Sequence, residues 1–81
     1  MKVVYSTRFK AHYDQLPATS QAHFQLIDAH VVAGNFDILR RNAWVYYIGL
    51  GGGFIAWGSV TDANEFYWRD VDVPAMVPVI L

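Results

Sequence analysis

The chain contains no cysteine, and an excess of basic residues is also missing. Without cysteine, the protein has no disulfide framework and no zinc site built on thiolates. Six Lys and Arg stand against seven Asp and Glu, which gives a formal net charge of −1. Nucleic-acid-binding domains usually carry a surplus of basic residues, so nucleic acid is a less favoured partner than protein.

Long apolar runs are absent as well. No window reaches the ~18 uninterrupted apolar residues of a membrane span, and the opening MKVVYSTRFK becomes charged too soon for a signal peptide. We therefore expect a cytoplasmic protein with no membrane partner. Even so, 54% of the residues are hydrophobic and 16% are aromatic. This exceeds what one small core can cover, so we expect part of the surface to be buried against a partner protein or a second copy.

The three histidines do not predict a metal site. His23 and His30 are separated by about two helical turns, or about 10.5 Å of rise, which is too far for one ion. His12 belongs to a different expected helix. No serine or cysteine has the neighbours of a nucleophilic triad. We therefore expect neither a metal nor a cofactor.

What is present is a regular order of helices and strands. The first expected helix covers residues 7–15, with Ser6 or Thr7 as its N-cap, and the second begins near Pro17 and ends at Gly34. Their apolar stripes consist of Phe9, Tyr13 and Leu16 in the first helix, and of Phe24, Ile27 and Val31, widened by Leu26 and Val32, in the second.

Residues 43–60, AWVYYIGLGGGFIAWGSV, have the pattern of a β-hairpin. Two apolar arms flank three glycines, and a turn through Gly51 and Gly52 is favoured because glycine adopts a positive φ at no steric cost. The three glycines do not predict a phosphate-binding loop, because no lysine and no helix follow them. Strands are expected at residues 3–5, 43–50, 53–60 and 65–71, with weaker strand character at 36–39.

These elements predict an α+β fold of order β-α-α-β-β-β, in which a helical hairpin packs on a small antiparallel sheet. Residues 1–81 form one expected domain, with 72–81 as an extended apolar tail. Both faces of the first hairpin arm are apolar, so one face should meet the helices and the other needs a cover. Core packing and a protein interface are favoured over base stacking for the aromatic residues. The expected interaction residues are Trp44, Tyr46, Phe54, Trp57 and Trp68.

Phe9, Lys10, Tyr13, Leu16 and Pro17 form the pattern F-K-x-x-Y-x-x-L-P. This opening, followed by a helix and an aromatic hairpin, resembles the RelE/ParE superfamily of bacterial toxin–antitoxin toxins. The segment from Tyr46 to Ile48, followed by Gly51, is similar to the family's strand before its hairpin turn. The resemblance covers residues 3–72 and implies a RelE/ParE-like fold and a partner antitoxin.

The resemblance implies an incomplete RNA-cleaving site. Arg40 and Arg41 lie where RNA-cleaving members have basic residues before the hairpin, and Arg69 is similar in place to an arginine of the last strand. In RNA-cleaving members an arginine commonly follows the hairpin turn, where this chain has Phe54. Those members also commonly have a tyrosine or histidine at the position where this chain has Asp72. The candidate catalytic residues are therefore Arg40, Arg41 and Arg69.

Each charged group also has a simpler interpretation. Arg40 and Arg41 fit a solvated pair, and Arg69 fits an exposed ion-pair cluster with Asp70 and Asp72. The favoured hypothesis is a toxin-like protein that is not an enzyme and acts by binding an antitoxin and a cellular target such as gyrase. The alternatives are a non-catalytic homo-oligomeric protein of the same fold and, third, a ribosome-dependent mRNA endonuclease.

Overall fold

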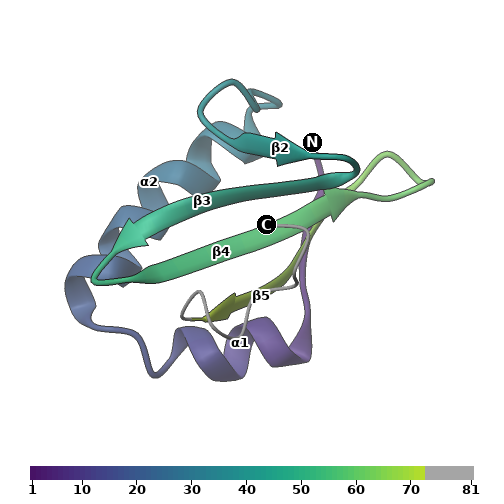
Figure 1. Cartoon of the computed structure of the whole chain (residues 1–81). Coiled ribbons are helices and arrows are strands. Elements are labelled where there is room, and N and C mark those ends of the chain that lie inside the picture. Colours follow the sequence, from purple (N-terminus) through teal and green to yellow (C-terminus); the bar gives the residue numbers. More distant parts are fainter. Residues whose placement is uncertain (73–81) are drawn as a thin grey trace.

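A computed structural model describes residues 1–72 as two helices packed on a five-stranded sheet (Figure 1). The elements in chain order are β1 (Val3–Tyr5), α1 (Thr7–Tyr13), α2 (Ala18–Val32), β2 (Arg40–Asn42), β3 (Val45–Gly51), β4 (Phe54–Val60) and β5 (Phe66–Asp72). The predicted α+β fold is confirmed. Neither helix is long and apolar enough to cross a membrane. Apart from Asp72, the predicted apolar tail lies outside the described residues.

The strand order is β1-β5-β4-β3-β2, and the sheet is mixed rather than wholly antiparallel. β2, β3, β4 and β5 pair antiparallel, as predicted for the last three, whereas β1 runs parallel to β5. β2 was not predicted, and the strand character expected at residues 36–39 is wrong, because those residues form a turn. The three residues of β2 are all polar and exposed. This fits a short edge strand, but such residues give no apolar pattern from which a strand could be predicted.

The β3–β4 hairpin turns at the glycines, as predicted. Gly51, Gly52 and Gly53 have φ values of 80°, 64° and 84°, in the region that only glycine enters freely. Ser6 is the N-cap of α1, since its Oγ accepts the amide hydrogen of Phe9 at 2.8 Å.

Both helices and one face of the sheet enclose a single core. Trp68 lies at its centre, fully buried, with ring centroids 4.9 Å from Phe24 and 4.7 Å from Phe66. Leu26 and Val32 do not widen the stripe of α2, because they are 70% and 47% exposed. Leu26 lies about 200° round the helix from Phe24, which places it on the solvent side.

A bulge interrupts the pairing of β4 with β5. Trp57 is opposite Asp70 and Gly58 is opposite Trp68, so Arg69 is an extra residue on β5. After this bulge Val71 enters the core and Asp70 turns toward α1. Because of the bulge, Asp70 contacts α1, whereas the side chain of Arg69 contacts β4.

Candidate functional site

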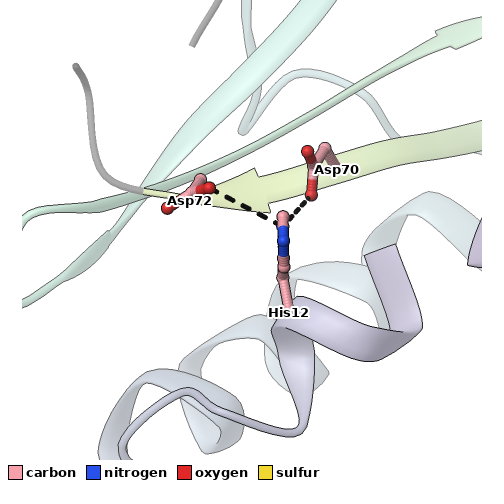
Figure 2. A group of neighbouring side chains, drawn as sticks. All are labelled: His12, Asp70 and Asp72. Carbon is pink, nitrogen blue, oxygen red and sulfur yellow. Dashed lines mark hydrogen bonds and ion pairs between the residues drawn. The ribbon is translucent and has the colours of Figure 1, made fainter. Parts of the chain in front are cut away.

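The first polar cluster joins α1 to the end of β5. Figure 2 shows His12 projecting from the helix toward Asp70 and Asp72 on the strand. The Nδ1 atom of His12 lies 2.7 Å from Oδ1 of Asp70 and 3.7 Å from Oδ2 of Asp72. Arg8 stands one turn before His12 on the same helix face, and its Nε is 3.3 Å from Oδ2 of Asp70.

Asp70 is the anchor of this cluster, which we call the α1–β5 ion-pair cluster (Arg8, His12, Asp70 and Asp72). Only 5% of the residue is exposed, and a buried carboxylate needs partners. Its Oδ1 also accepts the amide hydrogen of Val71 at 2.8 Å. The interpretation of Asp70 as an exposed partner of Arg69 is therefore wrong.

Three groups of this cluster could hold a divalent cation. One ligand atom from each of His12, Asp70 and Asp72 lies within 4.8 Å of the others. The sequence did not suggest this set, because 58 residues separate His12 from Asp70. Since Arg8 and His12 both contact Asp70, the same contacts also link helix α1 to strand β5.

The second cluster is built around Arg69 and lies on the sheet face opposite the helices. The Nε–H of Arg69 donates to Oγ of Ser59 at 2.9 Å. Its guanidinium carbon lies 5.5 Å from the ring centre of Trp44 and 5.2 Å from that of Tyr67, which are cation–π distances. We call Arg69, Ser59, Trp44 and Tyr67 the arginine–aromatic cluster.

The structure separates the two adjacent arginines of β2. Arg40 is in register with Tyr47, Tyr47 with Trp57 and Trp57 with Asp70, so Arg40 lies in a cross-strand row that reaches β5 at the residue after Arg69. Arg41 pairs with Tyr46, whose ring packs against the core on the helix side. Its guanidinium carbon lies 5.5 Å from that ring centre, and its Nε–H donates to the carbonyl of Ala43.

The five predicted interaction residues differ sharply in exposure. Trp44 is 58% exposed, whereas Trp57 is buried and Trp68 lies in the centre of the core. Tyr46 and Phe54 are partly buried and pack against the core. Trp44 is thus the one of the five that presents most of its surface.

A third polar group, which the sequence did not suggest, lies in a pocket between α1 and α2. Asp28 accepts a hydrogen bond from the hydroxyl of Tyr5 and another from the indole N–H of Trp68, the latter at 2.9 Å. Burial, followed by the hydrogen bond and negative charge of Asp28, raises the pKa of Tyr5 far above its ordinary value. The pocket measures about 290 Å³ and has mainly apolar walls. Its lining consists of Tyr5, Phe9, Lys10, Tyr13, Asp14, Phe24, Gln25 and Asp28.

Comparison with known proteins bears on the fold. No family model and no curated protein sequence matches the chain. A structure of the intact E. coli RelBE toxin–antitoxin complex matches with a TM-score of 0.70 and 13% identity, over 89% of this chain and 94% of that one. A free mutant of the E. coli toxin RelE, in which two arginines are replaced by alanine, matches with a TM-score of 0.72 and 17% identity, over 93% and 85%.

The fold is RelE-like. The resemblance seen in the opening pattern of α1 is thereby confirmed at the level of the fold. At 13–17% identity the similarity shows the architecture alone. The roles of individual side chains have to be argued from the contacts that they make in this structure.

Proposed function

We propose that this chain is the toxin component of a toxin–antitoxin pair and that a cognate antitoxin binds it. The observation that supports this is the RelE-like fold over nearly the whole described chain, with a match to a toxin in complex with its antitoxin. Exposed apolar side chains lie in two places, Leu26 and Val32 on α2 and Trp44 on the opposite face of the sheet, and contact with a partner at either place agrees with this proposal.

We further propose that the protein acts by binding a protein target such as gyrase. The residue after the hairpin turn is Phe54, which packs against the core and brings no cation to the sheet. Arg41 lies on the other side of the sheet from Arg40 and Arg69. This sheet face therefore carries fewer cations than in RNA-cleaving members to stabilise the negative charge that develops on the phosphate during cleavage.

The test is induced expression in a bacterial host, with and without the product of a neighbouring antitoxin-sized reading frame. Growth arrest that co-expression relieves is the expected result. DNA damage without RNA decay would support a gyrase-like target. Normal growth, together with purification as a stable oligomer of this chain alone, would refute the proposal and support the homo-oligomeric alternative.

A second candidate function, ribosome-dependent mRNA cleavage, is favoured by the arginine–aromatic cluster. An arginine between two aromatic rings can contact phosphate while the rings stack on bases. The matched test replaces Arg40 or Arg69 by alanine, with Arg41→Ala as the control from the opposite face. If RNA is the target, the first two variants lose RNA decay and growth arrest, and the control keeps both.

A further inference from the structure

The pocket between α1 and α2 holds a carboxylate that lacks a cationic partner. Asp28 receives two hydrogen bonds, and both come from neutral groups, Tyr5 and Trp68. Within residues 1–72, no lysine, arginine or histidine lies within ion-pair distance of Asp28. Asp28 is half-buried beside mainly apolar walls, and its two hydrogen bonds bring no positive charge, so a cation that enters the pocket meets no competing ion pair on this carboxylate.

Aromatic rings form the walls around this carboxylate. Phe9 lies 5.8 Å from Tyr13 and 5.0 Å from Phe24 between ring centres, and Tyr5 lies 5.9 Å from Phe9. Aromatic faces attract cations, and arginine more often than lysine uses them, because its guanidinium is planar and weakly hydrated. Asp14 adds a second carboxylate to the pocket lining.

We propose that this pocket receives an arginine side chain of the cognate antitoxin, with its guanidinium directed to Asp28. The identity of the occupant rests on the proposed toxin–antitoxin function, whereas the preference for a cation rests on the pocket itself. The pocket is open to solvent and large enough, at about 290 Å³, for a long side chain to enter. It lies on the helix side, so its occupation leaves the arginine–aromatic cluster accessible.

Lys10 provides a test of the electrostatic argument. Its side chain lines the pocket but forms no ion pair with any described carboxylate. A lysine at this position repels an incoming guanidinium. Lys10→Gln should therefore strengthen binding of a cation, whereas Asp28→Asn should weaken it.

The first arm of the experiment uses a small probe. N-acetylarginine amide is titrated into the 15N-labelled protein, and the indole N–H signal of Trp68 is followed, because that group donates directly to Asp28. The neutral control probe is N-acetylcitrulline amide, which has the same shape without the charge. Asparagine at position 28 keeps the size and can hydrogen-bond both Tyr5 and Trp68, so the variant should remain folded.

The expected result is a saturable shift with the arginine probe, no saturable shift with citrulline, and an affinity about tenfold or more weaker in Asp28→Asn. Equal shifts with both probes, or equal affinity in the variant, would overturn the pocket's preference for a cation. Backbone amide spectra of the variant, compared with those of the wild type, show whether the fold is retained.

The second arm measures antitoxin affinity for the wild type, Asp28→Asn and the control Asp14→Asn. We expect the Asp28 variant to lose about tenfold or more and the control to lose less, since Asp14 is exposed. Full affinity in Asp28→Asn would overturn the antitoxin arginine as the occupant. An antitoxin that does not bind the wild type would overturn the proposed function and the occupant together, while the probe arm still decides the chemistry of the pocket.

Discussion

Gly58 on β4 is the position where a single added methyl group should do most damage. A Cβ there would lie 2.4 Å from the carbonyl oxygen of Tyr67 and 2.8 Å from Cε1 of Phe66. The third neighbour, Cα of Trp68, is 3.1 Å away. Two of the three atoms belong to the backbone of β5, so relief requires movement of the strand beside the bulge.

The magnitude follows from two opposing effects. Inserting a methyl group into a packed site costs about 1–3 kcal/mol, and contact with backbone places Gly58→Ala in the upper half of that range. Alanine also reduces the freedom of the unfolded chain, which returns about 0.4–1 kcal/mol. We therefore expect a net loss of about 2 kcal/mol, which for a domain of this size lowers Tm by roughly 8–16 °C.

Gly49→Ala is the matched control. Gly49 lies on the adjacent strand β3, and no described atom is within 4 Å of the Cβ that would be added. Thermal and urea unfolding of both variants measure the difference. We expect the control to unfold within about 1 kcal/mol of the wild type. If Gly58→Ala were as stable as Gly49→Ala, the close approach of β4 to β5 would be wrong.

Three further predictions concern polar contacts. Ser6→Ala should cost about 1 kcal/mol in urea unfolding, because α1 loses its cap, and Ser6→Thr should retain most of the stability. Asp70→Ala should cost about 1–3 kcal/mol, because it removes a buried acceptor, whereas Arg8→Ala, whose side chain is 75% exposed, should cost less than about 1 kcal/mol. The raised pKa of Tyr5 means that the folded state holds this proton more tightly, so its stabilising contribution is present below about pH 10 and is lost as pH rises further. The free energy of unfolding should therefore fall less steeply above about pH 10 in Tyr5→Phe than in the wild type, and equal slopes would contradict the contact.

Local signals predicted much of the scaffold. The glycine turn, the cap of α1 and the apolar stripe of α2 each depend on residues close together in the chain, whose preferences can be judged from spacing alone. Leu26 was assigned wrongly because a hydrophobic residue in a helix need not lie on its buried face. The three polar residues of β2 carried no strand propensity, and that strand exists only because β3 offers an edge.

The candidate sites depend on contacts that spacing does not reveal. Asp28 meets Tyr5 across 23 residues and Trp68 across 40, so in the sequence it is only an aspartate within a helix. The opposite faces of Arg40 and Arg41 follow from strand alternation, but only once β2 is known to be a strand. Sequence reasoning therefore found Arg69, Asp70 and Asp72, but it paired Asp70 with Arg69 instead of with α1, and it did not single out Asp28.

The bulge on β5 determines where the charges of Arg69 and Asp70 lie. In the sequence Arg69 and Asp70 are neighbours and fit a self-neutralising pair. In the structure Asp70 contacts Arg8 and His12 on α1, and Arg69 forms no ion pair with any carboxylate of residues 1–72. Its contacts are a hydroxyl and two aromatic rings, which leave its charge uncompensated. A protein with net charge −1 thus keeps a cation on the sheet face opposite the helices, where an acidic partner or a phosphate could bind.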